Sequence, residues 1–139
     1  MSSIPKPMGE VKYILIHHEK CPREAFHYRI QSDGTQVALL PEQHRGQHPY
    51  SIGIVLDGNF DQEKVPTGIL ESLKNLVLKL KLKYPDAKIG AHRQIRGDKN
   101  TSCPGRLFPL RDVLTWSRTG LLKERDEFIV QDIESQYGP

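Results

Sequence analysis

Short apolar runs separated by polar turns dominate the first ninety residues of the chain. Runs of β-branched and aliphatic side chains of this length are typical of buried strands. Asp33-Gly34 lies between two of them and indicates a hairpin, because glycine adopts a positive φ readily. The predicted strands are residues 11–17, 27–31, 35–40, 50–56 and 87–91.

Two helices are predicted from apolar positions at helical spacing. Residues 66–84 carry a leucine-rich stripe, with Pro66 suited to a first turn and Pro85 to a stop. Residues 110–116 form a second, shorter helix behind Pro109. The mixed pattern of the last residues, 121–139, predicts a short strand or helix on the surface and then disorder.

This order of elements predicts an α/β fold, with a mixed central β-sheet of about five strands and helices packed on its faces. A length of 139 residues favours one domain, spanning 1–139, with a core at about 11–118 and a C-terminal extension at 121–139. The chain is also long enough to bury a core without staples.

Composition excludes several classes of function. A net charge of +3 is too small and too dispersed for a nucleic-acid-binding surface, and Lys79, Lys81 and Lys83 read as a solvated helix face. No run approaches the roughly 20 apolar residues of a membrane span. The first residues lack the apolar core of a signal peptide, so we expect cytoplasmic synthesis. We also expect a monomer.

Three potential metal ligands follow two of the predicted strands. His17 ends the first strand, His92 ends the last, and Cys103 lies in the loop beyond. If these strands are neighbours, both imidazoles emerge at one edge of the sheet, where the loop brings Cys103 between them. Zn²⁺ prefers histidine nitrogen and cysteine thiolate, and three protein ligands leave a fourth position open for chemistry. The alternative is ordinary hydrogen-bonded histidines, because most histidines bind nothing.

Cys21 leaves further alternatives open. A disulfide with Cys103 is one, but we favour two thiols because Cys103 has a use as a thiolate ligand. Cys21 would also complete a closed His₂Cys₂ set, which is typical of structural zinc. The open three-ligand site is the favoured interpretation.

Five segments of the chain occur in an order seen in one family. They are residues 14–18 (ILIHH), 26–35 (FHYRIQSDGT), 51–60 (SIGIVLDGNF), 90–93 (GAHR) and 101–105 (TSCPG). Together they resemble the zinc-dependent N-acetylmuramoyl-L-alanine amidases, which include phage lysozyme-type amidases and peptidoglycan-recognition proteins. The resemblance covers roughly residues 11–118, and its segments are specific as an ordered set rather than singly.

The resemblance implies a zinc-bearing groove at one sheet edge and a hydrolase. The bond cleaved would join the lactyl group of N-acetylmuramic acid to the L-alanine of the stem peptide. His17, rather than His18, would be the first zinc ligand, His92 the second and Cys103 the third. Thr101 matches a family position that assists at the oxyanion. The partner would be peptidoglycan or its muropeptide fragments. Two routes to them fit a chain without a signal peptide, namely phage- or prophage-type release and the recycling of wall fragments.

Four further side chains are candidates for lesser roles. His44 matches a groove histidine and would contact substrate, although His44 and His48 also fit a solvated loop. Arg93 and Arg96 are suited to pair with stem-peptide carboxylates, with solvated charge as the alternative. His27 matches a family histidine that we expect to be structural.

The chain departs from the family where a catalytic tyrosine usually stands, because Phe26 occupies that position. Phe26 would still line the substrate site. Tyr28, two residues on, would take over the catalytic role of the tyrosine if both residues belong to one strand and so share a face. The helix usually found between the first strand and the hairpin is missing, and the loop before Cys103 is longer. Val55 replaces a glutamate of some relatives. A peptidoglycan-binding protein with weak or no turnover is therefore the alternative function.

Overall fold

A five-stranded sheet forms the centre of the protein. The computed structural model describes residues 10–21, 25–46, 48, 50–94 and 101–119. Arg96 and the predicted extension at 121–139 lie outside the described residues, and the single-domain boundaries stay a prediction. In chain order the elements are β1 (Tyr13–His18), β2 (Tyr28–Ile30), β3 (Gln36–Ala38), β4 (Ser51–Leu56), α1 (Thr67–Lys83), β5 (Lys88–Ala91), the 3₁₀ turn η1 (His92–Gln94) and α2 (Leu110–Thr119).

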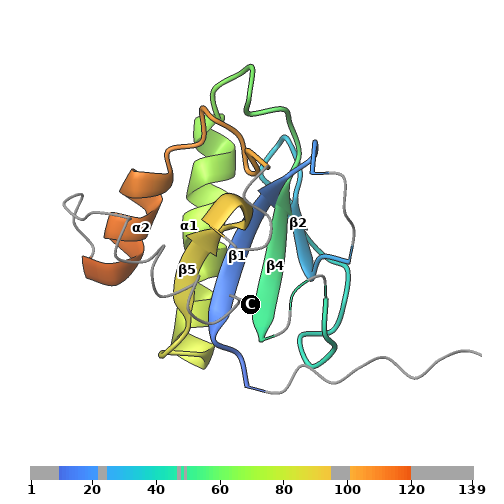
Figure 1. Cartoon of the computed structure of the whole chain (residues 1–139), viewed down its shortest axis with the longest axis vertical. Coiled ribbons are helices and arrows are strands. Elements are labelled where there is room, and N and C mark those ends of the chain that lie inside the picture. Colours follow the sequence, from blue (N-terminus) through green and yellow to red (C-terminus); the bar gives the residue numbers. More distant parts are fainter. Residues whose placement is uncertain (1–9, 22–24, 47, 49, 95–100, 120–139) are drawn as a thin grey trace, which may run out of the picture.

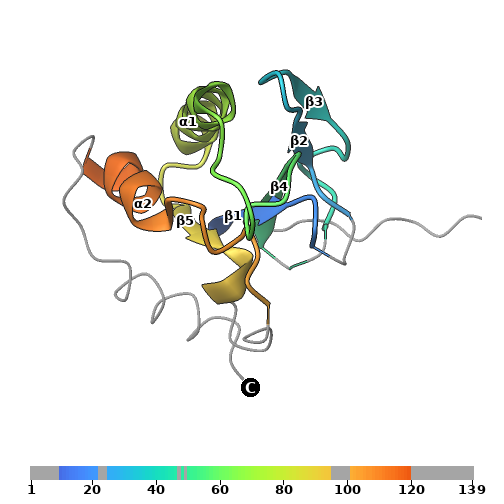
Figure 2. The same cartoon turned by 90° about the horizontal axis from the view of Figure 1, so that it is seen from above.

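The sheet has the order β3-β2-β4-β1-β5 (Figures 1 and 2). β1 pairs in parallel with β4 and with β5, β2 pairs in parallel with β4, and only the β2–β3 hairpin is antiparallel. The predicted mixed sheet is confirmed, and the first and last predicted strands are neighbours. Because parallel strands end at the same edge, the residues after β1 and β5 meet there.

Both described helices lie on the same side of the sheet, and η1 lies on the other (Figure 2). α1 buries an apolar stripe against the sheet, and every residue of β1 and β4 is buried. Strands covered on both faces read as continuous apolar runs, which explains why residues 11–17 and 50–56 stood out in the sequence. Ile14 and Ile16 pair with Ile52 and Ile54, and all four are fully buried.

α1 ends in contacts that the sequence did not suggest. Lys81 donates from Nζ to the carbonyl oxygens of Pro85 and Ala87, at 3.0 and 2.6 Å, and Lys83 pairs with Glu42 at 2.9 Å. Cations at a helix C-terminus also complement its dipole. Lys81 therefore fixes the turn into β5, and Lys83 ties the end of α1 to the segment after β3, so two of the three lysines expected to form a solvated face make structural contacts. No helix within the described residues is long and apolar enough to cross a membrane.

Candidate metal centre

Four side chains meet beyond the carboxyl ends of β1 and β5. Each offers one ligand atom, all four atoms lie within 4.8 Å of one another, and all four residues are buried. The three predicted ligands are thus brought together, and a fourth residue joins them. The four are His17, Cys21, His92 and Cys103.

The donor set fits Zn²⁺. With bonds of about 2.3 Å to sulfur and 2.0–2.1 Å to nitrogen, neighbouring ligand atoms of a tetrahedral site lie roughly 3.3–3.8 Å apart. The Sγ atom of Cys21 lies 3.3 Å from Nδ1 of His92 and 3.8 Å from Nδ1 of His17. The Sγ atom of Cys103 lies 3.8 Å from Nδ1 of His17. These three separations lie in the range of a tetrahedral zinc site.

His18 turns away from the cluster, because neighbouring strand residues face opposite sides of a sheet. Its Nδ1 accepts a hydrogen bond from the backbone N–H of Phe60 at 3.2 Å. Its own backbone N–H points toward Cys103 Sγ at 3.4 Å. That donor favours the thiolate form of Cys103, a supporting contact of the kind that tunes metal ligands.

Arg93 holds the loop that carries Cys103. Its guanidinium donates to the carbonyl oxygens of Ser102, at 3.2 Å, and Gly105, at 2.7 Å, while its backbone N–H donates to Cys103 O at 2.9 Å. The backbone N–H of Cys103 also donates to Oγ1 of Thr101 at 3.1 Å. Arg93 was expected to meet substrate carboxylates, but its contacts are those of a positioning residue.

Burial sets the protonation of the metal-free cluster. It lowers the pKa of His17, since a charged imidazole is poorly solvated there. Burial, followed by the adjacent Cys21 thiol, raises the pKa of the Cys103 thiol. Without metal the imidazole of His17 is therefore neutral and Cys103 carries its proton. A metal that binds must displace that thiol proton.

Two further rings pack against the histidines. Phe26 lies with its ring centroid 4.7 Å from that of His17. His48 stacks on His17 at 6.0 Å and meets His92 edge-on at 5.0 Å. Gly53 lies beneath, where an added Cβ would sit 3.5 Å from Phe26 and 3.7 Å from His17 Nε2. His48, read from sequence as a loop residue, is therefore part of the site.

His27 anchors the loop that carries His44 and His48. Its Nδ1 accepts from the backbone N–H of Gly53 at 3.0 Å, and its Nε2 donates to the carbonyl oxygen of His44 at 2.7 Å. Burial lowers the pKa of His27, so the ring is neutral and has this one tautomer. Its contacts are structural, as expected. The half-buried His44 contributes its carbonyl, and it is His48 that reaches the cluster.

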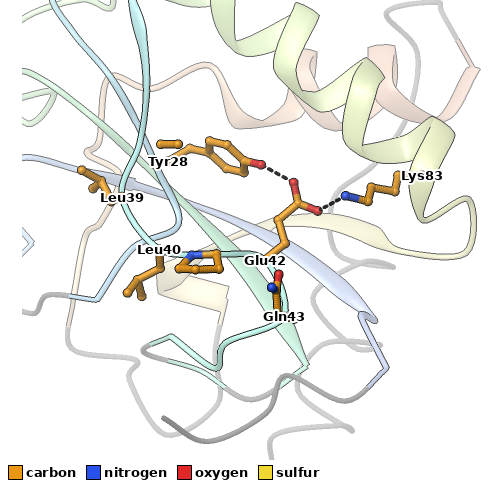
Figure 3. Close-up of a pocket in the computed structure, with 8 residues that line it drawn as sticks. Tyr28, Leu39, Leu40, Glu42, Gln43 and Lys83 are labelled. Carbon is orange, nitrogen blue, oxygen red and sulfur yellow. Dashed lines mark hydrogen bonds and ion pairs between the residues drawn. The ribbon is translucent and has the colours of Figure 1, made fainter. Parts of the chain in front are cut away.

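Tyr28 is not brought to the cluster. It pairs with Ile54, whereas His17 pairs with Val55, so the two side chains face opposite sides of the sheet. The hydroxyl of Tyr28 donates to Glu42 at the rim of a cavity of about 400 Å³ (Figure 3). Phe26 lies outside β2, which removes the premise that the two share one strand face.

The cavity of Figure 3 is lined by residues of β2, the segment after β3 and the end of α1. Glu42 is its central polar group. Its carboxylate accepts from Tyr28, from Tyr84 at 2.7 Å and from Lys83 at 2.9 Å. A carboxylate held by three protein donors has a structural role, and it ties the hairpin side of the sheet to α1.

The fold and the site together define an α/β protein with two histidines and two cysteines at one sheet edge that could hold a metal ion. The model of a single family, described as N-acetylmuramoyl-L-alanine amidase, matches residues 7–106. This chain therefore belongs to the N-acetylmuramoyl-L-alanine amidase family.

Solved structures agree with this assignment. The match to the N-acetylmuramoyl-L-alanine amidase LysC from Clostridium intestinale has 25% sequence identity and a TM-score of 0.71. It covers 80% of this chain and 87% of the LysC chain. Wild-type Drosophila PGRP-LB is 26% identical, covers 77% and 85%, and has a TM-score of 0.63. A PGRP-LB mutant in complex with tracheal cytotoxin is 23% identical, covers 87% and 89%, and has a TM-score of 0.67. A comparison with curated proteins finds no match.

Proposed function

We propose that this protein is a zinc-dependent N-acetylmuramoyl-L-alanine amidase. It hydrolyses the amide between the lactyl group of N-acetylmuramic acid and the L-alanine of the stem peptide. The observation that carries the proposal is the convergence of His17, His92 and Cys103 within 4.8 Å, in a chain of this family. Two amidase or recognition-protein structures at 25 and 26% identity support the same substrate class.

The residues of the chain would hold the metal through three anchored atoms. Bound zinc supplies Lewis-acid polarisation of a carbonyl and a water of lowered pKa. His17 and His92 present Nδ1 to the centre, and the His18 N–H steadies the thiolate of Cys103. Neutral imidazoles are the form that ligates, and burial already favours that form at His17.

Thr101 is the candidate to stabilise charge on the substrate. Its Oγ1 accepts from the backbone N–H of Cys103, which leaves the hydroxyl hydrogen to donate elsewhere. This contact keeps Thr101 beside a proposed ligand, and its half-burial leaves it partly accessible from the surface. We propose that it donates to the oxygen of the scissile carbonyl as negative charge develops there. A single donor of this kind typically contributes ~10²–10³ in rate.

Phe26 favours a second candidate function, muropeptide binding with weak or no turnover. Its ring lies against His17 and supplies an apolar wall without any donor. If a tyrosine hydroxyl donates there in relatives, its loss lowers the rate by about 10²–10³ without removing the binding surface. A PGRP-LB mutant is known in complex with tracheal cytotoxin, so the fold accommodates such a ligand.

The test combines bound metal with analysis of digested muropeptides. Wild type is expected to hold one zinc and to release stem peptides slowly, whereas Cys103→Ala loses both. Ser102→Ala is the matched control, since the Ser102 hydroxyl donates to Asp61 rather than to the cluster. Phe26→Tyr should raise the rate by up to about 10²-fold. If wild type and Phe26→Tyr both bind peptidoglycan without releasing stem peptides, the binding function is established. A wild type without zinc would overturn the amidase proposal.

A further inference from the structure

We propose that the Cys21 thiolate is a fourth zinc ligand, which closes the position that an amidase needs open. The inference rests on the zinc part of the proposed function and goes beyond the His17, His92 and Cys103 set. It makes the zinc-loaded protein latent until Cys21 leaves the metal. Closed four-ligand sites are typical of structural zinc, and catalytic sites keep one position for water or substrate.

The geometry brings Cys21 as close to the histidines as Cys103 is to His17. Its Sγ lies 3.3 Å from Nδ1 of His92 and 3.8 Å from Nδ1 of His17. The Sγ of Cys103 lies at the same 3.8 Å from Nδ1 of His17. Two thiols and two imidazoles whose ligand atoms all lie within 4.8 Å of one another can fill the four positions of tetrahedral zinc. A water ligand would have to occupy the place where Cys21 Sγ stands.

The local sequence explains how Cys21 reaches the cluster. The chain turns sharply after β1, where the backbone N–H of Cys21 donates to the carbonyl oxygen of His18 at 2.9 Å. Cys21 follows His17 by four residues and returns its side chain to the end of the same strand. Only nine residues separate His18 from Tyr28, so there is no room for a long helix in this connection. The shortened connection and the extra ligand are thus one feature of this chain.

Cys21 is the ligand best suited to leave. His17 belongs to a strand paired on both sides, and the Cys103 loop is held by Arg93. Cys21 lies in the turn beyond β1, with 8% of its surface exposed against 1–2% for the other three ligands. Rotation of this one side chain would leave the anchored three-ligand set intact. Replacement of Cys21 should therefore free one coordination position while zinc stays bound to the other three ligands.

X-ray absorption at the zinc edge tests the ligand count directly. Zinc–sulfur bonds of about 2.3 Å are distinguished from zinc–nitrogen or zinc–oxygen bonds of 2.0–2.2 Å. Two sulfurs are expected in wild type and one in Cys21→Ala, with zinc retained in both. Cys21→Ser provides a second variant of nearly the same volume, and circular dichroism checks that each variant folds. One sulfur in wild type would overturn the inference while leaving the amidase proposal standing.

A second readout tests whether the site is closed. In the Co²⁺-loaded proteins, azide should change the visible spectrum of Cys21→Ala and leave that of wild type unchanged. Zinc-loaded Cys21→Ala should also release stem peptides about tenfold faster or more, if Cys21 is bound nine-tenths of the time. Loss of zinc from folded Cys21→Ala and Cys21→Ser would overturn the inference in favour of a purely structural site. No zinc in wild type would overturn this inference and the proposed function together.

Discussion

Replacement of Arg93 by methionine should weaken both the fold and zinc binding. The guanidinium donates to two backbone carbonyls of the loop that carries Cys103, at 3.2 and 2.7 Å. Hydrogen bonds from charged groups contribute about 1.5–3 kcal/mol each, and half-burial places these near the lower end. Arg93→Met is therefore expected to lower the free energy of unfolding by about 2–4 kcal/mol. Loss of a residue that supports a metal ligand typically lowers metal affinity about 10–100-fold.

The assay for this prediction is chemical unfolding with and without zinc, together with a competition titration against a zinc indicator. Arg106→Met is the matched control in the same loop. Arg106 is 76% exposed and lies 3.9 Å from Asp61, so its removal should change stability by less than about 1 kcal/mol. Unchanged stability and zinc affinity in Arg93→Met, with a raised KM for muropeptide, would refute the positioning role and restore the substrate contact.

Three further predictions concern metal, pH and backbone. Chelation of zinc should lower the Tm by roughly 8 °C, because zinc at 100 times its Kd contributes about 2.7 kcal/mol; an unchanged Tm would argue against a bound metal. Burial raises the pKa of Glu42, but hydrogen bonds from Lys83 and two tyrosines together lower it below its usual 4.5. The contribution of Glu42 to the free energy of unfolding is therefore complete above pH 4.5 and is lost as pH falls through the lowered pKa. Glu42→Gln should cost about 1–3 kcal/mol at pH 7 and flatten the acid-unfolding curve in urea titrations. Gly105 has φ +110°, and an added Cβ would lie 2.4 Å from the carbonyl carbon of Phe60, so Gly105→Ala should cost at least about 2 kcal/mol in thermal unfolding. A Cβ added at Gly68, in α1, would have no neighbouring heavy atom outside its own helix backbone within 4 Å. Gly68→Ala should therefore leave the free energy of unfolding unchanged or raise it.

The strands could be predicted because they are buried on both faces. Continuous apolar runs at 11–17 and 50–56 identify central strands whatever their neighbours are. The ligand positions could be predicted for a related reason, because polar residues at the ends of two neighbouring parallel strands meet at one edge of the sheet. That β1 and β5 are in fact neighbours came from the resemblance and the structure, because strand order depends on pairings that one sequence does not reveal.

Other features depend on contacts between distant segments. Cys21 and His48 lie in loops whose paths are not set by hydrophobic periodicity. The sequence therefore leaves Cys21 as an alternative fourth ligand and does not predict that His48 approaches His17. Arg93 looked like an exposed charge, since nothing in its neighbours indicates that its guanidinium reaches Ser102 and Gly105. The hydroxyl of Tyr28 was misplaced because β2 begins at that residue, which breaks the alternation assumed from Phe26.

The most direct test of the proposed amidase activity is mass spectrometry of muropeptides after incubation with the zinc-loaded protein. Stem peptides with a free L-alanine amino group should be released slowly by wild type and faster by Cys21→Ala. No such peptides should appear with Cys103→Ala, whose folding is checked by circular dichroism. Intact muropeptides after incubation with both zinc-loaded wild type and Cys21→Ala would contradict the proposal that this chain is an amidase.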